Sequence, residues 1–536
     1  MYQITEGKLR KALKFLKKDL HDDWYCDLQN YEDISLDFAK LTLNINNRIK
    51  HGRGVYEAQK SVLLNIPKAN GGFRYTLELS PIDRIAYHVF GLELVELLDG
   101  AISFRVLSQR KSSDSKTLFK PFIEQWNKFE NYTRISAAEK YIIETDLSNY
   151  FENIQLDLLR FELVDAASTS NLTSSDFLRC MYLIDSVISI LKVISFDGTK
   201  GLPQNRDISH FLANIYMRHL DKKLNNQTYF RYVDDIRIIT STRAEANQLM
   251  LVLVEALRNY GLAINGTKTR ILVPGSKDHD ECINDFAFEE KKTDAMLNSG
   301  KRRFVMQSFH DIFRMTNKLL DDRQINDRHF RFYVNRLVTF LNAKDVSVPK
   351  KLRNEIAVKL VDQLKYHPEC ADQICVLVQA LGQHTKLQKS LITWAIDPDN
   401  LTYEWAVYSI IKTLTLQNCS SLELQRFCRA VLDDRKHSDP IVGISAVFLN
   451  KKASSKIEAR ISKENSHFLQ RHLLIALSFT PPSFLKDRKT PDRIHDEFIG
   501  QHFNLNKATR QDGFALVRPS ERLTHKELIK EISNYV

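Results

Sequence analysis

The chain lacks the cysteine pattern of a secreted or zinc-binding protein. Its seven cysteines are scattered through 536 residues, and no two of them form a CxxC pair. This pattern argues against a disulfide framework and a structural zinc site, and it favours a reducing compartment. No apolar run is long enough to span a bilayer, and the first residues do not form a signal peptide. We therefore expect a cytoplasmic protein with no membrane partner.

Glycine and strand-like runs both become scarce in the second half of the chain. Only four of the seventeen glycines lie beyond residue 300. Segments such as 401–416 and 421–433 carry apolar residues at helical spacing and recur between prolines. This pattern predicts stacked helices of the HEAT or armadillo type, with an irregular helical domain as the alternative.

The first half has a different texture. Helical stretches alternate there with short strand-like runs, which is typical of an α+β fold. We expect an N-terminal helical region over 1–60, an α+β domain over 60–290 and an all-α region over 300–536. The join near 290–303 is charged and contains glycine.

The charge balance is only mildly basic. Lysine and arginine total 77 against 66 for aspartate and glutamate, a net charge of +11. This sign suits a phosphate polyanion but identifies no partner. Residues 7–20 place leucines on one helical stripe and lysines on the other faces. Such a helix can bind nucleic acid or an anionic membrane, but we favour an ordinary surface helix.

What the chain does contain is an acidic pair between two β-rich runs. In the segment 229–239, aromatic and β-branched residues flank Asp234 and Asp235, which predicts two short strands joined by a turn. Adjacent carboxylates repel one another and are stabilised by a cation. Oxygen-rich sites suit Mg²⁺ or Mn²⁺, which accompany substrate phosphates. A polar hairpin tip is the alternative interpretation.

A second acidic strand end lies upstream. The apolar run 141–143 leads to Asp146, and a helix is expected to begin shortly after it. An aspartate there can meet Asp234 across adjacent strands and complete a site for two metal ions, which favours phosphoryl transfer. Taken alone, Asp146 is better explained as a helix N-cap.

These segments, with two others, resemble the palm of reverse transcriptases in order and spacing. Asp146 followed by Phe151 is similar to the first palm motif of the family. The segment Gly201-Leu-Pro-Gln204 resembles its template-and-nucleotide motif, and Tyr232-Val-Asp-Asp235 its catalytic hairpin. A turn that carries Lys268 looks like the lysine-bearing motif that follows. The implied fold is the right-hand palm of a polymerase.

A fingers block also resembles the bacterial members of this family. Two β-rich runs surround Asn70-Gly-Gly72 and predict a hairpin that carries Lys68 and Arg74, with Asp83-Arg84 beyond it. The resemblance covers roughly residues 60–275. It therefore implies an α+β palm and fingers, followed by the all-α region.

The resemblance assigns the catalytic roles. Asp146, Asp234 and Asp235 would ligate two Mg²⁺ or Mn²⁺ ions, with Asp235 as the weaker third ligand. Lys268 would protonate the departing pyrophosphate or steady its charge, and a solvated turn lysine is the alternative. The implied enzyme is an RNA-directed DNA polymerase.

The resemblance also assigns the substrate contacts. Lys68 and Arg74 would hold the triphosphate of the incoming dNTP, because arginine suits forked phosphate contacts. Phe151 would place a ring beneath the sugar and reject a 2′-hydroxyl by steric clash. Gln204 would contact the nucleotide or the template strand.

The chain departs from the bacterial pattern at two positions. Asn205-Arg206-Asp207 replaces the glycine-containing run that usually follows the proline and glutamine, which puts the positioning of the template in doubt. Val233 stands where the bacterial hairpin usually has alanine. We recognise no thumb, maturase or endonuclease segment after residue 275.

A reverse transcriptase core with a long helical extension resembles the abortive-infection class of bacterial antiphage enzymes. This resemblance implies a homo-oligomer that synthesises DNA without a conventional template. It also implies priming on a tyrosine, with the DNA product covalently attached to the protein. The candidate primers outside the palm are Tyr2, Tyr25, Tyr31 and Tyr56.

Three alternatives remain open. The enzyme could copy a bound non-coding RNA as its template. It could be a nucleic-acid-binding effector whose polymerase fold is vestigial, although all three carboxylates are present. The spacing of Arg323 and His329 loosely matches helical ribonucleases, which would make the C-terminal region a nuclease.

Overall fold

The computed structural model describes most of the chain. The described residues are 2–20, 23–31, 34, 37–50, 55–69, 71–283, 288–299, 301–326, 328–343, 348–360, 362–434, 436–461, 464 and 466–477. Residues from 478 onward, the last part of the expected all-α region, lie outside them.

The chain forms two compact units. Unit 1 comprises Met1–Cys26, Asp37–Ser61 and Leu77–Phe286. Unit 2 comprises Asp27–Leu36, Val62–Thr76 and Ala287–Val536. Unit 2 therefore includes two short segments that precede most of unit 1 in sequence. The expected boundaries at 60, 290 and 300 stay predictions.

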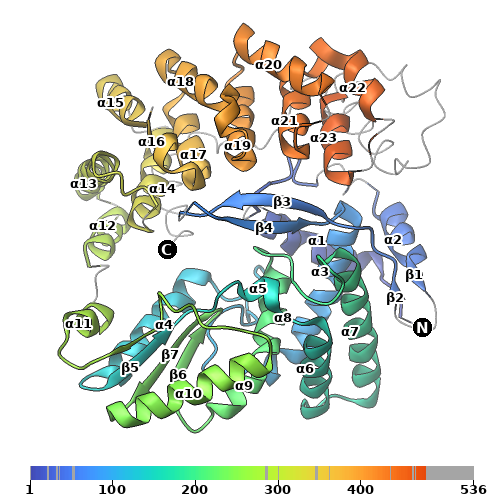
Figure 1. Cartoon of the computed structure of the whole chain (residues 1–536), viewed down its shortest axis with the longest axis vertical. Coiled ribbons are helices and arrows are strands. Elements are labelled where there is room, and N and C mark those ends of the chain that lie inside the picture. The colour runs from blue at the N-terminus through green and yellow to red at the C-terminus, as the bar shows by residue number, and fades with distance from the viewer. Residues whose placement is uncertain are drawn as a thin grey trace. The chain divides into compact units, whose positions relative to one another are not determined.

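Unit 1 contains a four-stranded antiparallel sheet with the strand order β6-β7-β5-β8. Its strands are β5 (Tyr141–Thr145), β6 (Thr228–Tyr232), β7 (Asp235–Thr240) and β8 (Arg270–Leu272). Their isoleucines and aromatic rings favour extended backbone and fill both faces. Helix α4 (Phe122–Ala137) packs on β6 and β7, and α10 (Arg243–Asn259) packs on β5 and β7 (Figure 1).

Further helices complete unit 1. They are α1 (Glu6–Asp19), α2 (Phe38–Asn47), α3 (Pro81–Leu98), α5 (Tyr150–Asn153), α6 (Leu156–Thr169), α7 (Ser174–Ile194), α8 (Asp207–Tyr216), α9 (Arg218–Lys223) and α11 (Lys277–Ile283), with the short strands β1 (Ile49–Lys50) and β2 (Val55–Tyr56). Helix α3 is buried along almost its whole length and packs against α1 and α7. Helices α6 and α8 pack together and continue this core.

The basic helix expected near the N-terminus is confirmed as α1. The expected leucine stripe is buried. Two of its lysines pair with acids of α3, Lys8 with Glu93 and Lys11 with Glu96, and two others donate to backbone carbonyls of residues 115 and 116. The four lysines are thus engaged within unit 1, which favours the surface-helix interpretation.

Unit 2 is mostly helical. Its helices are α12 (Phe288–Asn298), α13 (Arg302–Asp321), α14 (Arg328–Asn342), α15 (Lys350–Leu360), α16 (Gln363–Tyr366), α17 (Ala371–Leu381), α18 (Thr385–Ile396), α19 (Glu404–Leu416), α20 (Leu422–Asp433), α21 (Asp439–Leu449), α22 (Ser454–Ile461) and α23 (His467–Leu477). They pack in two rows (Figure 1). One row runs α14-α17-α19-α21-α23, and the other runs α13-α15-α18-α20-α22.

The predicted glycine-containing hairpin is confirmed and belongs largely to unit 2. Strand β3 (Val62–Pro67) pairs with β4 (Phe73–Glu78). Strand β3 packs on α19, where the amide of Asn65 donates to Glu404 at 3.0 Å. The ring of Phe73 stacks on Tyr403 at a centroid distance of 6.0 Å.

All seven cysteines are free thiols, as their scattered positions predicted. Across the described part of the chain, no helix is both long enough and apolar enough to cross a bilayer.

Candidate active site

The acidic pair lies at a turn between two strands, as the sequence predicted. Strand β6 ends at Tyr232 and β7 begins at Asp235, and these two residues pair across the hairpin. Val233 and Asp234 form the turn itself. The backbone of Val233 has φ of +55°, an uncommon conformation for a β-branched residue.

Strand β5 brings the third carboxylate to the same edge of the sheet. It pairs with β7, with Thr145 opposite Ile236 and Glu144 opposite Arg237. Continuing this register by one residue sets Asp146 opposite Asp235. Because side chains alternate along a strand, both carboxylates leave the same face of the sheet.

Burial and neighbouring negative charges shift the pKa of two of the three carboxylates. Burial, followed by the negative charges of Asp235 and Asp146, raises the pKa of Asp234 to about 7. Burial and the charge of Asp146 raise the pKa of Asp235 to about 6, although nearby cationic groups oppose this shift. Like charges in a partly desolvated site disfavour ionisation in this way unless a cation joins them.

Lys268 and Asn265 bind one oxygen of Asp146. Lys268 Nζ lies 2.9 Å from Asp146 Oδ2, and Asn265 Nδ2 donates to the same oxygen at 3.2 Å. The hydrogen bond to Asp146 raises the pKa of Lys268, so its ammonium stays protonated at neutral pH. The turn that carries Lys268 therefore reaches the carboxylates, as the sequence predicted, although the lysine's role stays a prediction.

No ready-made metal site is present in the described residues. No group of three or more His, Cys, Asp or Glu side chains within them is arranged to hold a metal ion. The oxygen of Asp146 that binds Lys268 and Asn265 is already committed to two donors. For this oxygen of Asp146 to ligate a cation, Asp146 or Lys268 must move.

The structure brings Phe151 and Gln204 close together. Phe151 lies on α5, where its ring meets His210 edge-on at a centroid distance of 4.7 Å. The amide of Leu202 donates to the carbonyl of Phe151, and Gln204 Nε2 donates to Glu152 at 3.2 Å. Phe151 and Gln204, which are both predicted to contact the substrate, thus lie near each other in unit 1, and their roles stay predictions.

Lys68 and Arg74 lie on the β3–β4 hairpin, within the part of the chain that groups with unit 2. The three aspartates belong to unit 1. The proposed contact of these two basic residues with a triphosphate stays a prediction.

Arg206 explains one departure from the bacterial motif. It is buried, pairs with Asp23, and donates to Glu78 at 2.7 Å. Arg84, which the sequence placed in a fingers block, pairs with the same Asp23 and with Asp19. These charges form a buried ionic network of unit 1. In this chain the position that usually holds a small residue is therefore occupied by Arg206, a buried arginine with ionic partners inside unit 1.

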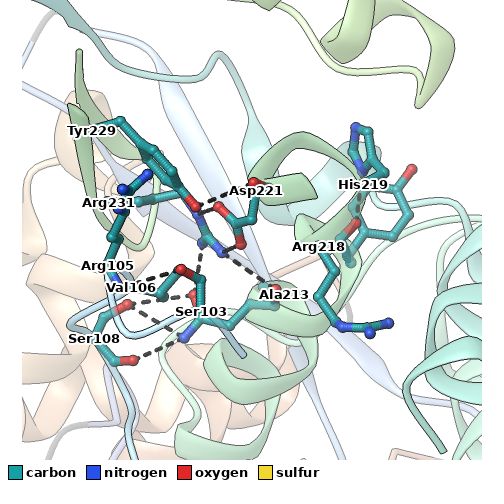
Figure 2. Close-up of polar contacts among 12 residues, drawn as sticks. Ser103, Arg105, Val106, Ser108, Ala213, Arg218, His219, Asp221, Tyr229 and Arg231 are labelled. Atoms are coloured by element: carbon teal, nitrogen blue, oxygen red, sulfur yellow. Dashed lines mark hydrogen bonds and ion pairs between the residues drawn. The ribbon is translucent and has the colours of Figure 1, made fainter. Parts of the chain in front are cut away.

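Sequence reasoning missed a buried polar network directly beneath the acidic turn. Its members are Ser108, Asn214, Asp221 and Arg231. Figure 2 shows Ser108, Asp221 and Arg231. One signal could have revealed the network. Side chains alternate along a strand, so Arg231 shares a face with Tyr229 and Val233. A charged residue on a face that otherwise carries apolar residues indicates a buried polar partner.

The candidate priming tyrosines have little exposed surface. Tyr25, Tyr31 and Tyr56 are buried, and Tyr56 donates to Asp83 at 2.9 Å. The hydroxyl of Tyr2 donates to Glu93.

The two candidate nuclease residues contact different partners within unit 2. The guanidinium of Arg323 lies over the ring of Tyr366 at 3.9 Å, and His329 Nδ1 lies 2.6 Å from Glu290. These contacts give no support to a shared catalytic site, so the nuclease interpretation gains nothing from the structure.

Solved structures to which this chain shows some similarity include two telomerases. The telomerase of Candida albicans, in complex with the TWJ fragment of telomeric RNA, is 12% identical with a TM-score of 0.31, and the match covers 66% of this chain and 67% of that chain. The apo telomerase of Candida tropicalis is 12% identical with a TM-score of 0.31, covering 79% and 70% respectively.

Sequence comparisons identify the domain that contains the acidic turn. A putative COX1/OXI3 intron 1 protein of Saccharomyces cerevisiae is 28% identical over 182 residues, which make up 33% of this chain. The aligned part spans 19% of that relative. Residues 66–309 match the family model described as reverse transcriptase (RNA-dependent DNA polymerase). These residues of the chain are therefore a reverse transcriptase domain.

Proposed function

We propose that this chain is an RNA-directed DNA polymerase that transfers nucleotidyl groups from dNTPs to a growing DNA strand. One observation carries the proposal. Within a reverse transcriptase domain, burial together with the negative charges of neighbouring aspartates raises the pKa of Asp234 to about 7 and that of Asp235 to about 6. Perturbed groups of this kind gather at functional sites.

The three aspartates fit a pair of divalent cations in their chemistry. They are all oxygen donors, they repel one another, and such donor sets suit Mg²⁺ or Mn²⁺. Asp146, Asp234 and Asp235 would hold the ions, once the Lys268 contact with Asp146 rearranges. When bound, two such cations would stabilise the attacking and leaving oxygens of an in-line displacement.

The other residues have roles in the same reaction. The 3′-hydroxyl of the primer loses its proton to water as its oxygen forms a bond to the α-phosphorus of the dNTP, and the bond from that phosphorus to the pyrophosphate oxygen breaks. Lys268, held protonated, donates a proton to the departing pyrophosphate. Phe151 excludes a 2′-hydroxyl, and Gln204 aligns the nucleotide or template. Lys68 and Arg74 bind the triphosphate, since both cations suit phosphate oxygens.

The test is DNA synthesis on an RNA template with a DNA primer, in Mg²⁺ and separately in Mn²⁺. We expect wild-type protein to extend the primer, and Asp234→Asn to lose at least about a thousandfold in rate, because transition-state charge loses its main stabilisation. The matched control is Asp157→Asn. Asp157 is exposed on α6 and pairs only with Lys192 at the surface, so this variant should keep wild-type activity.

The finer proposal is that the chain acts in antiphage defence, as a member of the abortive-infection class. The stacked helices of unit 2 support it, because a HEAT-like extension of a reverse transcriptase domain characterises the resemblance. Members of this class would work as homo-oligomers and prime DNA on the protein itself.

Protein priming has a direct test. Purified protein is incubated with labelled dNTPs and no primer or template, and the product is run on a denaturing gel with and without protease. Label that stays on the protein until digestion, and is lost in Asp234→Asn, supports self-priming. The four candidate priming tyrosines named above have little exposed surface, whereas Tyr132 on α4 is 41% exposed. Tyr132→Phe is therefore tested beside Tyr2→Phe.

Two other outcomes of these assays separate the alternatives. Synthesis that depends on co-purifying RNA identifies a template-directed enzyme with a bound RNA partner. Absence of synthesis under every condition, with the fold intact, favours the nucleic-acid-binding effector.

A further inference from the structure

The backbone of the acidic turn is held from both sides of a single residue. The amide of Val233 donates to Ser108 Oγ at 2.9 Å, and its carbonyl accepts from Arg231 Nη1 at 3.3 Å. Val233 is β-branched and has positive φ, so its conformation is strained and persists only where the surroundings enforce it. Asp234 follows it directly. The orientation of that carboxylate therefore depends on how firmly the peptide of Val233 is fixed.

Arg231 is fully buried, and its guanidinium is saturated with acceptors. It forms a forked pair with Asp221 on α9, at 3.2 Å through Nε and 2.7 Å through Nη2. Nη1 also donates to Asn214 Oδ1 at 2.8 Å. Figure 2 shows the guanidinium directed at Asp221 beneath the strand. A planar fork with these partners has little rotational freedom, so the nitrogen beneath Val233 is fixed in place.

Ser108 is fixed by the same Asn214 and by a backbone contact of its neighbour. Asn214 Nδ2 donates to the carbonyl of Ser108 at 2.9 Å, and both side chains are buried. The residue before it is tied to β6, because the amide of Leu107 donates to the carbonyl of Arg231 at 3.0 Å. The hydroxyl is thus presented to the turn by a segment more than a hundred residues away in sequence.

We propose that Ser108 and Arg231 are positioning residues of the polymerase site, which hold the Val233 peptide in its strained turn and thereby aim Asp234 and Asp235. This inference rests on the proposed function. Neither side chain touches the substrate or the reacting atoms. Both act through the peptide of Val233, and Asn214 with Asp221 fixes them in turn.

Ser108→Ala is the sharpest test, because it removes the hydroxyl that binds the turn and leaves the Arg231–Asp221 pair intact. We expect kcat to fall about three- to tenfold, the factor that corresponds to one ordinary hydrogen bond. The KM for dNTP should stay within about twofold, since triphosphate binding is assigned elsewhere. The Mg²⁺ concentration for half-maximal rate should rise, because two carboxylates lose their alignment.

The matched control is Ser209→Ala. Ser209 is also a buried serine of unit 1, and its hydroxyl hydrogen-bonds the Tyr87 hydroxyl at 3.0 Å, away from the turn. A general loss of packing would affect both variants alike. The proposal requires that only Ser108→Ala changes kcat and the Mg²⁺ dependence at matched Tm.

A double-mutant cycle with Val233→Gly separates positioning from a structural role. Glycine adopts positive φ without strain, so a turn with Gly at this position needs less restraint. The loss caused by Ser108→Ala should therefore be smaller in the Val233→Gly background. An equal loss in both backgrounds would overturn the proposal.

Amide hydrogen exchange in metal-free protein gives a readout that does not depend on activity. The Val233 amide should exchange at least about tenfold faster in Ser108→Ala, because its acceptor is gone and the turn opens more often. Unchanged exchange at Val233 would refute the positioning role even in an active enzyme. If wild-type protein synthesises no DNA but exchange still rises, the proposed function fails and the positioning of the turn stands.

Discussion

The hairpins β3–β4 and β6–β7 have different kinds of residue at the position of positive φ in their turns. Both β3–β4 and β6–β7 need a residue with positive φ. The first uses Gly71, with φ of +77° and no heavy atom within 4 Å of where a Cβ would lie. The second uses Val233, which has a Cβ and two branches, and restrains it with Ser108 and Arg231. Strain is thus kept where two aspartates must be aimed and avoided where only a change of direction is needed.

The largest expected effect comes from removing the buried support of the strained hairpin. Arg231→Met leaves Asp221 as an uncompensated buried carboxylate, so unit 1 should lose about 3–5 kcal/mol of unfolding free energy. Urea unfolding followed by circular dichroism measures this loss.

A surface pair provides the control for this variant. Arg160 binds Asp185 at 3.0 Å with side chains that are 43% and 36% exposed, so Arg160→Met should cost less than about 1 kcal/mol. Equal losses in the two variants would mean that Arg231 stabilises no more than a surface arginine, and the contrast between the two hairpins would disappear.

Much of this contrast could be predicted from the sequence. Alternating β-branched and aromatic residues predicted both hairpins, and the spacing of Asp146, Asp234 and Asp235 predicted a shared acidic site. These features depend on local pattern and on motifs of a few residues.

The rest depends on contacts between distant segments. Ser108 meets Val233 because residues 105–107 bind the backbone of β6, and Arg206 is buried because Asp23 and Glu78 supply its partners. No local periodicity marks such pairs. The grouping of Val62–Thr76 with unit 2 likewise follows from packing on α19 rather than from any property of the hairpin's own sequence.

The next effect concerns negative charge, which is present at only one of the two turns. Residues 68–72 contain no acidic side chain, whereas the pKa of Asp234 is raised to about 7. Since the unfolded value is about 4, the metal-free folded chain binds more protons than the unfolded chain between about pH 4 and about pH 7. The unfolding free energy should therefore fall as pH rises through this window.

Asp234→Asn removes this pH-dependent loss. At pH 8 in EDTA, the variant should be more stable than wild type by about 1–2 kcal/mol, a value reduced from the full pKa shift because the group is partly solvated. At pH 4 the two proteins should unfold alike. Asp157→Asn, whose side chain is 87% exposed, should track wild type at both pH values. Thermal unfolding across the pH range checks this, and a wild-type curve that is flat from pH 4 to 8 would contradict the repulsion.

The smallest effect tests whether positive φ is costly in these turns at all. Gly71→Ala should lower the unfolding free energy by about 1 kcal/mol. The position is sterically open, so the only destabilisation comes from an alanine backbone held at positive φ. Gly71→Asn should cost less, since asparagine tolerates the left-handed region. The reverse change, Val233→Gly, relieves strain but loses valine packing and gains chain entropy in the unfolded state, so its net effect should lie within about 1 kcal/mol. If Gly71→Ala is neutral, a Cβ at positive φ is not strained in this protein, and the restraints on Val233 would have no strain to oppose.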